Sequence, residues 1–443
     1  MKQVLLIVLI FSSHFLQAQD TQKYLIKTGK LFDSETAQFK AGLSILVNGN
    51  RVEVVKPTKD VTAAEERSHQ LVDLSGYTVM PGLIDCHTHL LYKEVLYPEN
   101  NFPGLDMAKE LIMEGDAYRA IYGAARAKAY LEAGITAVQD LGNSGLFADV
   151  ALRKCINEGI VTGPRMRCSG PGLSSEGGQV PGLIYKHRDI ANDEYRIIKG
   201  ADDAIQAVRE NITQGASVIK IFSDNAPNRT MLSAEEIQAI VKEAHRYNLR
   251  VTAHAVSNTS VHNAVINGVD AVEHGYTIDD TTLALMAKKG VMLIPTDGDS
   301  VSMVQYAKLQ FPGNPKIIED IIASRKPLAT RLLRAIDKGV VIAAGSDDYL
   351  DFKLPFAEPS KRTLVGYHEA GVSIPKILQF ATLNASRQLN WSNVIGIIKK
   401  GYFADLIAVD NAIENNIETI LNVEFVMKDG KIYVDKTGEK KPK

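Results

Sequence analysis

Cysteine, blocks of like charge and long apolar runs are scarce in this chain, and each scarcity argues against a class of protein. The 443 residues contain three cysteines, Cys86, Cys155 and Cys168, so a disulfide framework does not hold the fold. The spacing leaves a bridge between Cys155 and Cys168 open, but buried free thiols are the preferred interpretation. The 50 Lys and Arg residues nearly balance 52 Asp and Glu residues, and the one basic run is the tail EKKPK. This balance argues against a nucleic-acid partner.

The main apolar run of the chain lies at its beginning. Lys2 is followed closely by the octet VLLIVLIF and then by polar and small residues that end in Leu16-Gln17-Ala18. This layout is typical of a secretory signal peptide, residues 1–18, and it predicts a secreted or periplasmic protein. The alternative is an uncleaved membrane anchor. The run is too short to cross a bilayer of about 30 Å, and no later segment offers about 20 uninterrupted apolar residues, so no stable membrane span is expected.

The two ends of the chain share a β-rich texture. Short alternating runs separated by turns fill residues 19–78, and similar runs return in residues 400–443. Asn48-Gly49 and Asp429-Gly430 stand between such runs and predict hairpins. We therefore expect the two segments to pair into a small β-sandwich domain.

Residues 79–399 alternate strand-like and helix-like runs. Helical stretches such as SAEEIQAIVKEAHRYN open on a capping residue and close on Asn or Gly. The expected strands are Val79–His89, Ile135–Leu141, Arg165–Ser169, Ser217–Phe222, Arg250–Ala255, Ala271–His274, Val291–Pro295 and Val340–Ser346. Eight strands that alternate with helices predict an α/β fold, a (β/α)8 TIM barrel. The alternative is an open doubly wound sheet, but no glycine-rich phosphate loop follows an early strand.

Polar residues fall where the expected strands end. His87 and His89 point the same way because side chains alternate along a strand, although on their own they could be two satisfied core histidines. Other polar side chains fall at the same edge, at or near the ends of later strands: Lys220, His254, His274 and Asp347. Active sites of barrels gather at this face.

Lys220 is the most informative of these residues because it lies inside the apolar run SVIKIF. A buried lone cation is costly, so one interpretation is an ion pair with a carboxylate. Desolvation also favours the neutral amine. A neutral amine can take up carbon dioxide and become a carbamate, an anionic oxygen ligand able to bridge two cations.

These motifs identify a resemblance. The runs PGLIDCHTHL, VIKIF, VTAHA, VEHGYTIDD, AAGSDD and the tail from NASRQLN to FADLIAVD resemble the metal-dependent amidohydrolase superfamily, in its imidazolonepropionase-like and prolidase-like branch. The resemblance implies two divalent metal ions. His87 and His89 would bind the more buried ion with Asp347, His254 and His274 the other, and Lys220, as an N6-carboxylated side chain, would bridge both.

The donor set suits zinc, with manganese or cobalt as substitutes. In such a site a hydroxide between the cations attacks the carbonyl, and Asp347 acts as base and then as acid, so that an amide C–N bond is cleaved. The alternative for Asp347 is a turn former at the end of a strand.

The resemblance leaves the substrate open. We expect a small molecule, a dipeptide or an N-acyl amino acid, and name Gln179, Tyr276, Arg188 and Arg229 as candidate contacts, since an arginine grips a carboxylate through two parallel hydrogen bonds. Prolidase-like relatives often have Gly-Gly-His where Gln179 follows two glycines here.

Other functions stay open beside this one. A cyclic-amide or lactone hydrolase and a deaminase are alternatives within the superfamily, although deaminases there usually lack the bridging lysine. A non-catalytic periplasmic binding protein is an alternative of another class. Because barrels of this kind commonly pair, a homo-oligomer is a further expectation.

Overall fold

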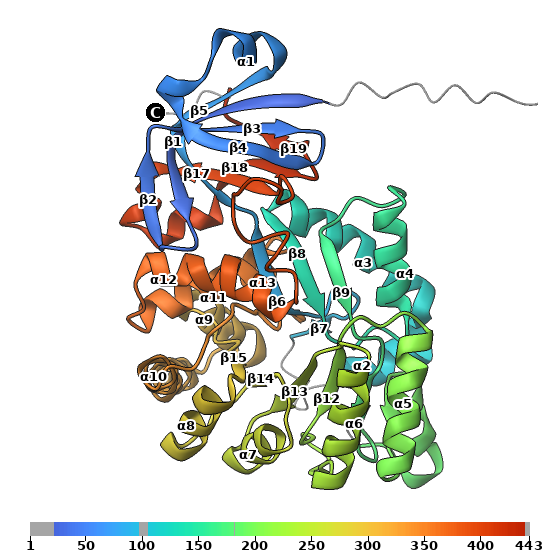
Figure 1. Cartoon of the computed structure of the whole chain (residues 1–443). Coiled ribbons are helices and arrows are strands. Elements are labelled where there is room, and N and C mark those ends of the chain that lie inside the picture. Colours follow the sequence, from blue (N-terminus) through green and yellow to red (C-terminus); the bar gives the residue numbers. More distant parts are fainter. Residues whose placement is uncertain (1–21, 97–104, 181, 439–443) are drawn as a thin grey trace, which may run out of the picture.

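The structure is a computed structural model that describes residues 22–96, 105–180 and 182–438. The predicted signal peptide lies outside these residues. Strands from both ends of the chain share one sheet, and the middle of the chain forms parallel strands flanked by helices (Figure 1). Within the described residues, no helix combines the length and the apolar character that crossing a bilayer requires.

The two ends of the chain share one hydrogen-bonded sheet in the order β19-β18-β17-β5-β1-β3-β4, with β2 paired to β1. Its strands are β1 (Lys23–Asp33), β2 (Gln38–Ala41), β3 (Leu43–Asn48), β4 (Arg51–Pro57), β5 (Gln70–Pro81), β17 (Leu406–Asp410), β18 (Val423–Lys428) and β19 (Lys431–Asp435). The antiparallel pair of β17 with β5 joins the two ends of the chain. Buried Ile26, Val47, Leu406 and Phe425 belong to its apolar core. A division of this sheet into two packed layers, as in a sandwich, stays a prediction.

Both predicted hairpins are present. Asp429 and Gly430 form the turn between β18 and β19 with φ values of 53° and 67°, the left-handed conformation that a two-residue turn of this kind requires. In the first hairpin Asn48 pairs with Arg51, so the turn lies one residue further along than the Asn48-Gly49 pair indicates.

The middle of the chain contributes two parallel sheets, β6-β8-β9 and β11-β10-β12-β13-β14-β15. Their strands are β6 (Leu83–Thr88), β8 (Ile135–Asp140), β9 (Arg165–Cys168), β10 (Gly172–Ser174), β11 (Tyr195–Ile197), β12 (Ile219–Phe222), β13 (Val251–Ala255), β14 (Ala271–His274) and β15 (Met292–Ile294). Ser217 N donates to Cys168 O at 2.8 Å and so connects the two sheets. β7 (Glu94–Val95) and β16 (Leu350–Asp351) form a separate two-stranded parallel sheet.

Two of the expected strands differ from the structure by more than one or two end residues. Val340–Ser346 is not a regular strand: it forms a single bridge, Ile342 with Leu293, although Cys86 N donates to Ala344 O at 2.9 Å on its other side. Ala344 N donates instead to Phe380 O, which takes this stretch out of a continuous ladder. The expected strand Val79–His89 is divided between β5 and β6 at Gly82, whose N–H donates to Asp405 O at 2.9 Å.

Helices follow most of these strands and cover them from outside (Figure 1). The helices of the middle region are α2 (Leu105–Lys109), η2 (Glu110–Glu114), α3 (Gly115–Glu132), α4 (Ala148–Asn157), η3 (Tyr185–Asp193), α5 (Ala201–Thr213), α6 (Ala234–Arg246), α7 (Asn258–Ile266), α8 (Asp280–Lys289), α9 (Ser300–Gln310), α10 (Pro315–Asp337), α11 (Glu358–Glu369), α12 (Ile374–Gln379), η4 (Phe380–Asn384) and α13 (Ala385–Gln388). The terminal sheet carries η1 (Thr58–Asp60), α1 (Ala63–Ser68), η5 (Asn411–Glu414) and η6 (Ile417–Leu421).

The ends of the helices follow the capping residues in the sequence. Ser233 and Glu236 form a reciprocal capping box at the start of α6, and Gly290 ends α8 in the left-handed conformation. All three cysteines are free thiols, and Cys86 and Cys168 are buried.

Candidate active site

A cavity of about 210 Å³ opens at the carboxyl ends of the parallel strands. All six residues that the sequence indicates as metal ligands line it: His87, His89, Lys220, His254, His274 and Asp347. They come from β6 and the residue directly after it, from β12, β13 and β14, and from the segment that follows residue 346.

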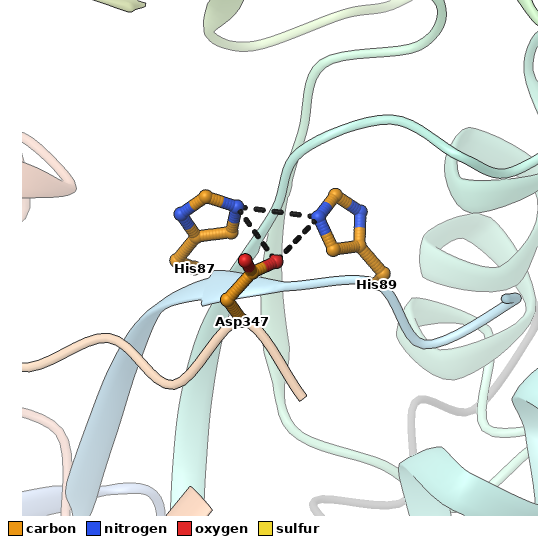
Figure 2. Close-up of side chains that lie close together, drawn as sticks. All are labelled: His87, His89 and Asp347. Carbon is orange, nitrogen blue, oxygen red and sulfur yellow. Dashed lines mark hydrogen bonds and ion pairs between the residues drawn. The ribbon is translucent and has the colours of Figure 1, made fainter. Parts of the chain in front are cut away.

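His87, His89 and Asp347 form the tightest group of donors in this cavity (Figure 2). Their ligand atoms all lie within 4.8 Å of one another. The two Nε2 atoms are 3.2 Å apart, and Asp347 Oδ1 lies 3.3 Å from Nε2 of His87 and 3.0 Å from that of His89. Two imidazole nitrogens and a carboxylate oxygen are a donor set that zinc accepts.

The opposite nitrogen of each ring is held by the protein. His87 Nδ1 lies 2.8 Å from Glu273 Oε2, and His89 Nδ1 lies 3.0 Å from Gly142 O. These partners fix the two rings with Nε2 toward the cavity, as in metal sites where a second group orients each ligand. Burial lowers the pKa of His87 well below its usual value, and the nearby Lys220 adds to this effect, so the ring is neutral and able to bind a cation.

Asp347 is placed by its backbone. Its N–H donates to His87 O at 2.8 Å, and its φ of 56° is in the left-handed region, a conformation that functional residues adopt at a cost. Burial raises the pKa of Asp347, but His87, His89 and Lys220 outweigh this and leave the pKa below its ordinary value. The side chain is therefore a carboxylate at neutral pH.

His254 and His274 line the same cavity. Their ring centroids are 4.6 Å apart, and His274 is 5.1 Å from His87. Thr296 Oγ1 lies 2.9 Å from His274 Nδ1. Burial lowers the pKa of both rings well below the usual value for histidine, so they are neutral donors.

Lys220 lines the same cavity with 1% of its surface exposed. Burial lowers its pKa, although Glu273 and Asp347 oppose this at a distance, without a hydrogen bond. Its Nζ lies 5.3 Å from the centre of the Phe222 ring. The direct ion pair that would explain a buried lysine is not found among the described residues, and an amine shifted toward neutrality is the form that takes up carbon dioxide.

The structure brings two of the four candidate substrate contacts to the cavity. Gln179 Nε2 lies 3.2 Å from His254 Nε2, and Tyr276 Oη lies 3.3 Å from His274 Nδ1. Arg188 and Arg229 do not line the cavity. The guanidinium of Arg188 lies over the ring of Tyr185, and Arg229 is exposed.

The sequence did not indicate several further residues of this cavity. Tyr92, Glu94, Asn143 and Tyr349 also line the wall, and Glu273 orients His87. Glu273 precedes His274, and in a regular strand the two would point to opposite faces. The left-handed φ of 71° at His274 breaks the alternation, so both serve the same site, and the sequence carries no sign of this turn.

The model of the amidohydrolase family matches residues 78–433. The chain belongs to the amidohydrolase family. It is 29% identical to the ochratoxinase of Aspergillus niger over 391 residues, 80% of this chain and 75% of that protein. It is 24% identical to the imidazolonepropionase of Legionella pneumophila over 371 residues, 77% of this chain and 81% of that protein.

Among solved structures, a Xaa-Pro dipeptidase with bound methionine in its active site is similar, with a TM-score of 0.78 and 27% identity, over 93% of this chain and all (100%) of that one. The fold of this amidohydrolase is thus of the α/β TIM-barrel type. The protein is a hydrolase that acts on C–N bonds of small molecules, in the prolidase-like branch of its family.

Proposed function

We propose that this protein is an exported binuclear amidohydrolase that cleaves the amide bond of a dipeptide or an N-acyl amino acid. The observation that carries the proposal is the meeting of six donor side chains from distant parts of the sequence around one small cavity. The names of the similar ochratoxinase and Xaa-Pro dipeptidase support an amide substrate.

The residues present fit two divalent cations. His87, His89 and Asp347 would hold one, His254 and His274 the other, and a carboxylated Lys220 would contact both. Neutral imidazoles and anionic oxygens are donors that zinc accepts. When bound, such cations lower the pKa of water and polarise a carbonyl.

The protein's own groups then position the substrate and move the proton. Asp347 Oδ1 or Oδ2 accepts the proton of the attacking water and passes it to the departing nitrogen. Because its pKa is lowered, Asp347 is ionised at neutral pH and its carboxylate is free of the proton that it has to accept. Tyr276 and Gln179 stand at the cavity wall beside His274 and His254, where they would contact the substrate.

The remaining proposals concern the chain as a whole. Residues 1–18 would be a signal peptide that directs the protein to the periplasm or outside the cell. Residues 79–399 would form a closed barrel, with Val340–Ser346 between β15 and β6, and residues 19–78 with 400–443 a small sandwich. A homo-oligomer stays a prediction.

The test is the Asp347→Asn variant, measured for dipeptide hydrolysis and for metal content beside the wild type. Turnover is expected to fall at least about a hundredfold, because a general acid and base contributes roughly that much. Asp280→Asn, which removes an exposed carboxylate on α8, is the matched control. Unchanged turnover in Asp347→Asn would reject the proposed role.

The likeness to imidazolonepropionase supports a second candidate, the hydrolysis of a cyclic amide. A panel that contains dipeptides, N-acyl amino acids, cyclic amides and lactones, offered to the zinc-loaded protein, separates the two. Turnover confined to ring substrates would select the second candidate.

A further inference from the structure

The wall of the active-site cavity is poor in positive charge. Lys220 is the one lysine or arginine among the described residues that line it, and its carboxylated form would be an anion. A substrate carboxylate therefore finds no guanidinium in the described wall, and the predicted contacts Arg188 and Arg229 do not line it.

One wall of the cavity instead combines a carboxylate with aromatic rings. Glu94 in β7 is 4% exposed and accepts a hydrogen bond from Tyr92 Oη at 3.0 Å. The Tyr92 ring stacks on Tyr349 at 5.5 Å, and Tyr349 meets His89 edge to face at 5.9 Å. A carboxylate beside aromatic rings is the chemistry that holds an ammonium group.

Asn143 supplies a second acceptor near the same histidine. It lines the cavity and is 8% exposed, and its Oδ1 is buried without a hydrogen-bond partner among the described residues. Its φ is 55°, and it follows Gly142, whose carbonyl contacts His89. A buried acceptor without a donor is costly, so a donor carried by the substrate would stabilise this arrangement.

We propose that Glu94 and Asn143 hold a protonated amine on the acyl half of the substrate. The inference rests on the proposed amide hydrolysis and narrows it to substrates with a cationic amine, in preference to N-acyl amino acids without one. Either a free α-amino group or the side-chain amine of a lysine would supply this chemistry.

The experiment compares three substrates with the same scissile bond type: Leu-Leu, N-acetyl-Leu-Leu and N-acetyl-Lys-Leu. The wild type should cleave the amine-bearing substrates best. Glu94→Gln should lower kcat/KM for them roughly ten- to hundredfold, mainly through KM, because an interaction with a charged group is lost in ground and transition state alike. Hydrolysis of N-acetyl-Leu-Leu should not change.

Two further variants test whether the preference for an amine depends on Glu94 and Asn143. Asp351→Asn removes a carboxylate from β16, the strand paired with β7, but not from this cavity, and should leave all three rates unchanged. Asn143→Asp should raise the preference for the amine, which a variant that merely unfolds cannot do.

Each outcome separates the possibilities. A Glu94-dependent preference for Leu-Leu alone identifies the α-amino group, and one that extends to N-acetyl-Lys-Leu identifies the side-chain amine. Equal wild-type rates on all three substrates, or no effect of Glu94→Gln, would overturn the inference while leaving the proposed function standing. A wild type that cleaves no amide substrate would overturn the proposed function itself.

Discussion

His87 Nδ1 lies 2.8 Å from the carboxylate of Glu273, and this contact decides which nitrogen of the His87 ring faces the cavity. Glu273 is itself held by Thr252 Oγ1 from the neighbouring strand β13. The orientation of one ligand of the candidate metal site thus depends on side chains from two other strands.

Replacement of Glu273 should therefore weaken metal binding while the ligands stay in place. We expect Glu273→Gln to lower the affinity for zinc about ten- to hundredfold, the usual effect of losing a group that orients a ligand. Competition against a chelator measures this affinity. Glu66→Gln, on the exposed side of α1, should bind as the wild type does. Equal affinity in Glu273→Gln would show that His87 needs no such partner.

Lys220 should control how many metal ions the protein holds. Loading in buffer free of carbon dioxide should give less bound metal and less activity than loading with bicarbonate, and Lys220→Met should lose this difference. Metal analysis after removal of excess ions provides the measurement. Full metal content in Lys220→Met would contradict the bridging role.

Lys361 offers a control with the same chemistry elsewhere. It is also buried, and burial lowers its pKa to about 8, but its Nζ donates to Leu421 O at 2.6 Å, outside the cavity. Lys361→Met should keep the metal content of the wild type even where its stability falls.

Gly345 should not tolerate a side chain. A Cβ there would lie 2.3 Å from Ile294 Cγ2 and 3.0 Å from His87 Cβ, so Gly345→Ala should displace the segment that carries Asp347. We expect a loss of about 1–3 kcal/mol in the free energy of unfolding together with reduced metal content. Denaturant unfolding measures the first effect and metal analysis the second. A Cβ at Gly76 meets nothing within 4 Å, so Gly76→Ala is the matched control. If Gly345→Ala has the stability and metal content of the wild type, the segments around Ile294 and His87 can move apart at little cost, and the prediction is wrong.

Asp149 should make stability depend on pH. It accepts hydrogen bonds from Val150 N at 2.7 Å and Gly170 N at 2.9 Å, and burial, with Asp140 nearby, raises its pKa from the ordinary 3.8 to about 7. Between these values the folded chain holds the proton more tightly than the unfolded chain. The contribution of Asp149 to stability is therefore full below pH 3.8 and declines as the pH rises toward 7.

Urea unfolding at pH 5, 6 and 7 tests this expectation on the wild type and Asp149→Asn. The variant lacks the titrating group, so the stability difference between the two proteins should change with pH by up to about 1.4 kcal/mol per unit. A constant difference across this range would contradict the raised pKa.

The sequence predicted that the six candidate ligands meet at one edge of the strands, and they do line one cavity, because each of them lies in or directly after an apolar run. Strand runs such as Ala271–His274 agree with β14 residue for residue, and parallel strands bring their carboxyl ends to one edge. His254 and His274 could therefore be placed together without knowledge of any loop.

The rest of the site depends on features that apolar patterns do not record. The apolar run Val340–Ser346 predicts a strand, but it does not form a continuous ladder because Ala344 N donates to Phe380 O. Phe380 lies much later in the sequence, so the run itself carries no sign of this contact. Glu94 lies on a two-residue strand, too short for any periodicity. Arg188 and Arg229 are predicted from the chemistry of their side chains alone, and neither lines the cavity.

The pairing of β5 with β17 also has a consequence for the order in which the chain folds during synthesis. β5 pairs with β17 as far as Pro81 and Leu406, only two residues before the strand that bears His87 begins. During synthesis β5 cannot pair with β17 until nearly the whole polypeptide has left the ribosome. A nascent or prematurely terminated chain can thus contain all six candidate ligands and still lack the strand that supports His87 and His89. Completion of the site therefore requires the C-terminal part of the chain.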